Sequence, residues 1–116
     1  MSQPLNFKTL THLKSVIGDS LAPILRTYLE ITPPLVKELE AAIKQANAAE
    51  IKRHAHTLKG SSANIGAIDL PSLCLEMEGL ARNGDVKKAE ALYLKVNQAY
   101  RELETAIEQY LTTQPN

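Results

Sequence analysis

The stretch VKKAEALYLKVNQAYRELETAIEQYL, residues 86–111, is the longest uninterrupted helical pattern in this chain of 116 residues. Apolar side chains recur along it every three or four residues, which places them on one side of an α-helix. A long apolar side must be covered by other helices, so this stretch favours a helical bundle. The apolar positions are Ala89, Leu92, Tyr93, Val96, Tyr100, Leu103, Ile107 and Tyr110.

Further segments upstream have the same helical spacing, and signals for β-strands are almost absent. Together they predict a short N-terminal helix at about 6–17 and four bundle helices at about 20–46, 47–66, 69–83 and 85–111. The connecting links are short, so consecutive helices should be antiparallel. We therefore expect an all-α fold in a single domain, residues 1–116. It should be an up-down-up-down four-helix bundle with the short helix covering one end.

Residues at the expected helix ends support these boundaries. Glycine readily adopts the positive φ that ends a helix, and short polar side chains cap free N–H groups at helix starts. Asn47, with Glu50 three residues later, resembles a capping box. We expect helix stops at Gly18 and Gly66, and N-caps at Ser20, Asn47, Asp69 and Asp85.

The segment Thr32-Pro33-Pro34 interrupts the first of the expected bundle helices. Proline has no backbone N–H, so either Thr32 caps a new helix here or one helix bends. Tyr28 and Leu39 nevertheless keep the same apolar register on either side of the prolines. This preserved register favours one bent, collinear helix.

The composition argues against several classes of protein. Thirteen Lys and Arg residues balance thirteen Asp and Glu residues, so a nucleic-acid-binding role is not expected. The one cysteine, Cys74, cannot form an internal disulfide and lies on an apolar helix stripe. No apolar run approaches the ~20 residues of a membrane span, and residues 1–6 lack the pattern of a signal peptide. We expect a cytoplasmic protein that binds neither membranes nor nucleic acids.

The helix around His56 is unusual because its outer face is basic and small. At about 100° per residue, Lys59 and Gly60 fall within about 80° of His56. Glycine in a helix interior costs roughly 1 kcal/mol relative to alanine, and it clears space beside the ring. An outward imidazole with an adjacent ammonium suits a phosphoryl group, because the neutral ring can attack phosphorus and the cation balances its charge. The opposite half of the helix carries Ile51, Ala55, Leu58, Ser62 and Ile65.

The next helix should bring an acidic side chain to the same place. The link between the two helices lies near residues 67–68, so antiparallel pairing puts His56 level with Glu78. A carboxylate there could accept a hydrogen bond from one ring nitrogen and leave the other free to attack. Arg82, one turn further, could pair with Glu78 or reach phosphoryl oxygens.

The run His56-Thr57-Leu58-Lys59-Gly60-Ser61-Ser62, followed by Ile65-Gly66-Ala67, resembles the signature of histidine phosphotransfer (HPt) domains of multistep two-component relays. The resemblance extends over nearly the whole chain. It implies that His56 is the phosphorylated histidine, that Lys59 balances the phosphoryl charge and that Gly60 lets a receiver domain dock. Glu78 occupies the place where several family members have a glutamine that hydrogen-bonds the ring.

The resemblance implies a phosphorelay intermediate that takes a phosphoryl group from a receiver-domain aspartate and passes it to another receiver. The implied partners are response-regulator receiver domains and a hybrid sensor kinase, and the protein itself is expected to be a monomer. It should need no cofactor of its own, because Mg²⁺ is expected on the receiver. No nucleotide-binding motif is present, so we expect a carrier rather than a kinase. The alternative is a non-catalytic docking module for receiver or kinase domains.

The remaining candidate residues have simpler interpretations. His54 points toward the core side of its helix and is expected to be a partly buried packing residue. It cannot share a metal ion with the histidine two residues later, because such side chains diverge on a helix. His12 is expected to be an ordinary surface residue. Lys52 and Arg53 are either solvated charges or contributors to the field around a phosphoryl group.

Overall fold

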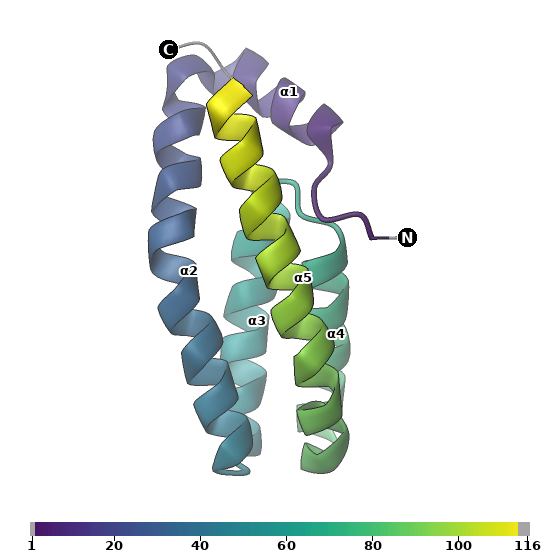
Figure 1. The fold of residues 1–116 in the computed structure, drawn as a ribbon. Coiled ribbons are helices and arrows are strands. Elements are labelled where there is room, and N and C mark those ends of the chain that lie inside the picture. Colours follow the sequence, from purple (N-terminus) through teal and green to yellow (C-terminus); the bar gives the residue numbers. More distant parts are fainter. Residues whose placement is uncertain (1, 114–116) are drawn as a thin grey trace.

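The computed structural model describes residues 2–113, and in this part of the chain nearly every residue is helical (Figure 1). The observed helix ends lie within two residues of the expected ones. Among residues 2–113, none of the helices combines the length and the apolar character needed to cross a bilayer. The α-helices are α1 (Phe7–Ile17), α2 (Leu21–Lys44), α3 (Ala48–Asn64), α4 (Asp69–Arg82) and α5 (Val86–Thr113).

Helices α2 to α5 form the expected up-down-up-down bundle, and the molecule measures about 45 × 26 × 20 Å (Figure 1). Each packs against its two neighbours in a ring, α2 on α3 and α5, and α4 on α3 and α5. The most extensive contact is that between α3 and α4. Helix α1 lies across the end of the bundle where α5 terminates, and a 3-10 turn, Gly18–Ser20, joins it directly to α2.

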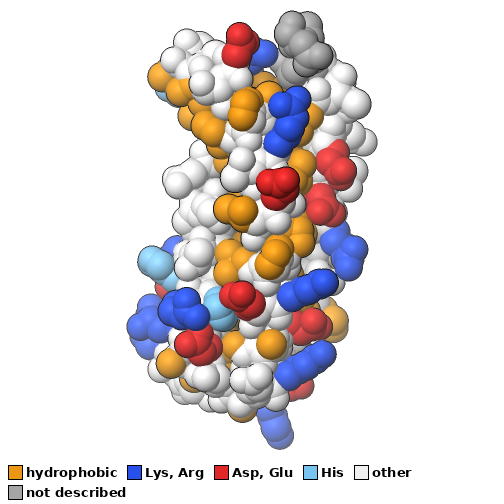
Figure 2. Space-filling model, turned by 90° about the vertical axis from the view of Figure 1, so that its left-hand side faces the viewer, with side chains coloured by type: hydrophobic (Ala, Val, Ile, Leu, Met, Phe, Trp, Pro, Cys, Tyr) orange, Lys and Arg blue, Asp and Glu red, His pale blue; other side chains and the backbone are white. Residues whose placement is uncertain are grey.

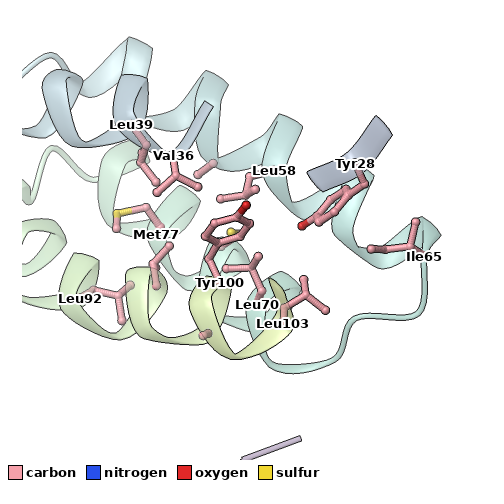
Figure 3. Close-up of a cluster of buried hydrophobic side chains, with 14 of the residues drawn as sticks. Tyr28, Val36, Leu39, Leu58, Ile65, Leu70, Met77, Leu92, Tyr100 and Leu103 are labelled. Carbon is pink, nitrogen blue, oxygen red and sulfur yellow. The ribbon is translucent and has the colours of Figure 1, made fainter. Parts of the chain in front are cut away.

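The core runs along the bundle axis and is built from the predicted apolar stripes of all four long helices (Figure 3). Cys74 is fully buried among these side chains, as expected from its place on the α4 stripe. Tyr28 is buried as well, and its hydroxyl shares a 2.6 Å hydrogen bond with the Ser62 hydroxyl across the α2–α3 contact. Large side chains with no exposed surface include Leu25, Leu39, Ile51, Leu58, Met77 and Leu103.

Helix α2 continues through Pro33 and Pro34, so the expectation of one collinear helix is correct and Thr32 caps no new helix. The prolines offer no N–H to the carbonyls four residues earlier. The Thr32 hydroxyl, just before the prolines, donates a 2.6 Å hydrogen bond to the Tyr28 carbonyl. Thr32 is buried, so this bond also satisfies its own polar group in the core.

Two of the four expected N-caps form as predicted. Asn47 accepts a hydrogen bond from the backbone N–H of Glu50 at 3.2 Å, and Asp85 accepts one from Lys88 at 3.1 Å. The reciprocal half of the capping box is absent, because the Glu50 carboxylate binds Arg53 instead. The backbone N–H of Asn47 does not need the Glu50 carboxylate as an acceptor, because it already donates to the carbonyl of Ala42.

The other two predicted N-caps, Ser20 and Asp69, are wrong. Ser20 already has helical backbone angles, because the 3-10 turn runs into α2 without a break, and its side chain makes no capping bond. Asp69 is the first residue of α4, and its carboxylate accepts the backbone N–H of Gln3 at 2.6 Å. The N-terminal segment lies along the α3–α4 link and supplies this donor, which the sequence of α4 alone does not reveal. Gly66, with φ of +90°, ends α3 as expected.

Candidate functional site

His56 lies on the outer face of α3, with 69% of its side chain exposed. Its helix is held in this rotation by the opposite face, where Ile51, Ala55 and Leu58 are fully buried. The apolar periodicity of the segment therefore fixes which way the imidazole points. The prediction of an outward ring is correct.

Glu78, on α4, meets His56 from the neighbouring helix. Its Oε2 lies 3.2 Å from Nδ1 of the ring, as the predicted antiparallel register required. The carboxylate is buried, with only 5% of the side chain exposed, whereas the imidazole is mostly in solvent. The ring is thus anchored through one nitrogen on the protein side, and Nε2 is left on the solvent side.

Lys59, one turn after His56, is the second partner of Glu78. Its Nζ lies 2.5 Å from Oε1, the carboxylate oxygen that the ring does not use. This contact is an ion pair rather than a well-aligned hydrogen bond, because Oε1 has no hydrogen bond of good geometry. Only 27% of the Lys59 side chain is exposed, since its ammonium turns inward toward α4.

Glu78 remains ionised at neutral pH. Burial by itself raises the pKa of this carboxyl, but the interactions with Lys59 and His56 outweigh burial and lower the pKa below its usual value. An ionised carboxylate can only accept a hydrogen bond, so Nδ1 of the facing ring must donate. The neutral imidazole then has its lone pair on Nε2, which is the nucleophilic arrangement for attack from solvent.

The surface beside the ring is open. A Cβ atom added at Gly60 would meet no atom within 4 Å apart from its sequence neighbours and the nearby backbone of its own helix, and the same holds at Gly79 on α4. Neither glycine is required by the packing of the bundle itself. Gly60 is exposed and leaves bare helix backbone one turn after His56, where another protein could approach closely.

Arg82 does not form an ion pair with Glu78, which is one of the two roles that the sequence suggests for it. It is exposed, and no hydrogen bond or ion pair joins the two residues in the part of the chain described. Lys59 fills that role from the other helix, because its ammonium reaches the buried carboxylate across the α3–α4 contact. Arg53 is also engaged, since its guanidinium binds Glu50 at 2.5 and 3.0 Å.

His54 is buried, as expected, but it has two acidic neighbours that the sequence analysis missed. Its Nε2 lies 3.3 Å from Oε2 of Glu50, and its Nδ1 lies 3.7 Å from Oε2 of Glu38 on α2. The four-residue spacing from Glu50 was a usable signal, whereas the Glu38 contact depends on helix packing. The nitrogens face different carboxylates, and within residues 2–113 no three acidic, His or Cys side chains form a metal-binding group. His12 is exposed.

An apolar groove of about 370 Å³ runs between α2 and α3. Ile24 and Ile31 flank it with 47% and 59% of their surface exposed. Asn64 also lines it and lies about 12 Å beyond His56 along α3, with Gly60 between them. Figure 2 shows this side of the molecule: apolar side chains run from its top to below its middle, and histidines lie among charged side chains in the lower part. The groove therefore continues the open surface beside the ring.

The sequence matches the family model described as the Hpt domain over residues 23–112. No curated protein sequence matches it significantly. The matched range contains α3, α4 and nearly all of α2 and α5, and therefore includes His56, Lys59, Gly60 and Glu78.

Several solved structures resemble this one. Histidine-containing phosphotransfer protein B from Pseudomonas aeruginosa is 26% identical, with a TM-score of 0.92 over 99% of this chain and 100% of that chain. The HPT domain of a sensor hybrid histidine kinase from Shewanella is 22% identical, with a TM-score of 0.82 over 97% of both chains. A histidine-containing phosphotransfer protein from Medicago truncatula is 21% identical, with a TM-score of 0.79 over 93% of this chain and 76% of that chain. The last two establish likeness of fold alone.

Proposed function

The chain belongs to the Hpt domain family, and we propose on this premise that it is a phosphorelay intermediate with His56 as the phosphoryl carrier. His56 accepts the group from the aspartyl phosphate of one receiver domain and gives it to an aspartate of another. The observation that carries the proposal is the anchored ring, with Nδ1 held by Glu78 at 3.2 Å and Nε2 free on the exposed side.

The transfer is a substitution at phosphorus. The lone pair of Nε2 forms the N–P bond while the P–O bond of the aspartyl phosphate breaks, and the aspartate leaves as a carboxylate. The proton stays on Nδ1, and the Nδ1–H group donates a hydrogen bond to the Glu78 carboxylate. Glu78 holds the ring in this tautomer and orientation, so Nε2 is already positioned for attack. Positioning of this kind is the main way in which such a protein accelerates phosphoryl transfer.

The neighbouring residues support the same step. Lys59 binds the same carboxylate as the ring and is proposed to balance the phosphoryl group. Gly60 is proposed to admit the receiver, since nothing of the chain fills the space above it. Arg82 is exposed one turn beyond Glu78 and is proposed to contact the phosphoryl oxygens or the receiver. The Mg²⁺ and most of the catalytic groups are expected on the receiver.

The proposed partners are response-regulator receiver domains and a hybrid sensor kinase, and the protein is proposed to act as a monomer. A receiver centred on His56 would also cover the groove between α2 and α3, because Ser61, which lines the groove, lies less than two helical turns after His56. Burial of Ile24 and Ile31 there would contribute apolar contact to the complex. The chain is a carrier in this scheme, and the receiver supplies the activated phosphate.

The substitution His56→Gln tests the proposal. We expect the variant to take up no phosphoryl group from a panel of phosphorylated receivers, while the wild type becomes labelled with an acid-labile phosphate. The bundle should stay folded, because the His56 side chain lies mostly in solvent. Transfer of labelled phosphate measures the first effect, and circular dichroism with thermal unfolding measures the second.

His12→Gln is the matched control, since His12 is an exposed histidine on α1. It should accept phosphate at the wild-type rate. Acid-labile labelling of His56→Gln would contradict the assignment. A wild type that binds receivers but never becomes labelled would instead favour the docking module.

A further inference from the structure

Glu78 is a buried anion that depends on a neighbouring cation. The carboxylate is 5% exposed, with Oε1 facing the ammonium of Lys59 and Oε2 facing Nδ1 of His56. A carboxylate removed from water is strongly destabilised unless charge and hydrogen bonds compensate it. In the unphosphorylated protein the imidazole can be neutral, so Lys59 is the group that supplies the charge.

Lys59 cannot keep this position and also neutralise a phosphoryl group on His56. The phosphoryl group would stand on Nε2, across the ring from the nitrogen that faces Glu78. Lys59 lies three residues after His56, so the two side chains are neighbours on the helix surface. A change of side-chain rotamer is enough to swing the ammonium from α4 to the solvent side of the ring. That movement removes the counter-charge of a buried carboxylate.

Phosphorylation itself provides a replacement. When Nε2 bonds to phosphorus and Nδ1 keeps its proton, the imidazole ring acquires a positive charge. That charge faces Oε2 of Glu78 at hydrogen-bond distance. The carboxylate therefore has one cationic partner in each state, first the ammonium and then the ring.

We propose that phosphorylation exchanges the counter-ion of Glu78: Lys59 leaves the carboxylate for the phosphoryl group, and the protonated phosphohistidine ring takes its place. The inference rests on the proposed function of His56. Glu78 acts here as a positioning residue that keeps the ring in its protonated form. In that form the onward step is easier, because the N–P electron pair returns to Nε2 and leaves a neutral imidazole while the acceptor aspartate bonds to phosphorus. Lys59 then returns to Glu78.

Other charged groups near the ring cannot replace Glu78. Arg53 is paired with Glu50, and Lys52 and Arg82 are exposed cations that would oppose a protonated ring. Cys74 lies one turn before Glu78 on α4, and burial together with the charge of Glu78 raises its pKa to about 12, so its thiol is neutral. In the described residues no side chain of α2 or α5 makes a hydrogen bond or ion pair with His56 or Glu78.

The substitution Glu78→Gln separates charge from orientation, because the glutamine oxygen can still accept the hydrogen bond from Nδ1. Wild type and variant are phosphorylated with phosphoramidate, a small donor that needs no receiver, and the phosphohistidine ring is titrated by ¹⁵N and ³¹P NMR. We expect the midpoint of the ring titration to fall by about 1 to 3 pH units in the variant, as for loss of an adjacent opposite charge. Glu76→Gln is the matched control, since Glu76 is an exposed carboxylate on α4, and its midpoint should equal that of the wild type.

A second measurement needs no variant. The ¹⁵Nζ resonance of Lys59 in the wild type should move on phosphorylation, because the ammonium changes partners. An unchanged Lys59 resonance, or equal ring midpoints in wild type and Glu78→Gln, would overturn the exchange while leaving His56 as the carrier. A wild type with no phosphoryl signal on His56 from phosphoramidate or from any receiver would overturn the proposed function, and the exchange with it.

Discussion

Glu78 joins the two side chains on which the proposed chemistry depends. It holds the ring of His56 through one oxygen and the ammonium of Lys59 through the other. The interactions outweigh the effect of burial and lower the pKa of this carboxyl, so the folded protein binds the proton less tightly than the unfolded chain does. The folded state is therefore stabilised at pH values above the ordinary glutamate pKa, and the contribution is lost as the pH falls through the lowered pKa.

Lys59→Ala tests this linkage. At neutral pH the variant should be less stable than the wild type by about 1–3 kcal/mol, because a buried carboxylate loses its charged partner. The difference should shrink in acid, where Glu78 is protonated and needs no counter-charge. Urea unfolding at a series of pH values measures both effects.

Lys52→Ala is the control for Lys59→Ala, since Lys52 is an exposed lysine on the same helix. Its effect should stay within about 0.5 kcal/mol of the wild type at every pH. A stability loss in Lys59→Ala that is the same in acid as at neutral pH would show that the ion pair with Glu78 is not its cause.

Helix α3 serves two functions through its two faces. The inner face fills the core with Ile51 and Leu58, whereas the outer face presents His56 and Gly60 to solvent. Nothing in the fold requires a glycine at position 60, because an added Cβ meets no atom within 4 Å and the backbone there is ordinary helix. Gly60 thus lowers the stability of α3, and it leaves an open surface beside the ring.

Substitutions at Gly60 should separate stability from docking. Gly60→Ala should stabilise the bundle by up to about 1 kcal/mol, since alanine is the better helix former. Gly60→Leu should also fold, but its side chain should slow transfer from a phosphorylated receiver and leave labelling by phosphoramidate intact. Thermal unfolding and the two labelling rates are the measurements. Receiver-driven labelling of Gly60→Leu at the wild-type rate would rule out the proposed role of the glycine.

The arrangement of the whole molecule brings the site and the groove onto one surface. Because the helices form a ring, α3 lies between α2 and α4 (Figure 1). Its contact with α4 makes the His56 site, and its contact with α2 makes the apolar groove. A partner that covers both the site and the groove would contact the polar side chains around His56 at one end and the exposed Ile24 and Ile31 at the other.

The double substitution Ile24→Ser, Ile31→Ser should weaken binding of a receiver domain by about tenfold or more, the effect of losing about 1.4 kcal/mol of apolar contact. Labelling by phosphoramidate should not change, since the groove does not touch the ring. Calorimetric titration with the receiver gives the affinity. Leu94→Ser is the control, because Leu94 on α5 is 73% exposed and lies outside the groove; equal weakening by both variants would contradict the docking surface.

The features that depend on one helix at a time follow from the amino-acid sequence alone. Apolar spacing predicted the helices and the bundle, and the same spacing in α3 showed that the ring of His56 points outward. Asn47 and Asp85 cap their helices as predicted because a cap is a contact within a few residues. The short α3–α4 link also fixed the register that places Glu78 beside His56, because so short a connection allows few alternative alignments of the two helices.

Contacts between side chains of different elements depend on how the helices pack together. Glu78 pairs with Lys59 across two helices rather than with Arg82 on its own helix, and Asp69 binds the N-terminal segment rather than capping α4. Periodicity fixes the direction of a side chain, but it does not fix the separation and rotation of neighbouring helices. Those quantities follow from packing of the whole core, and they decide which oxygen, ammonium or N–H lies within bonding distance.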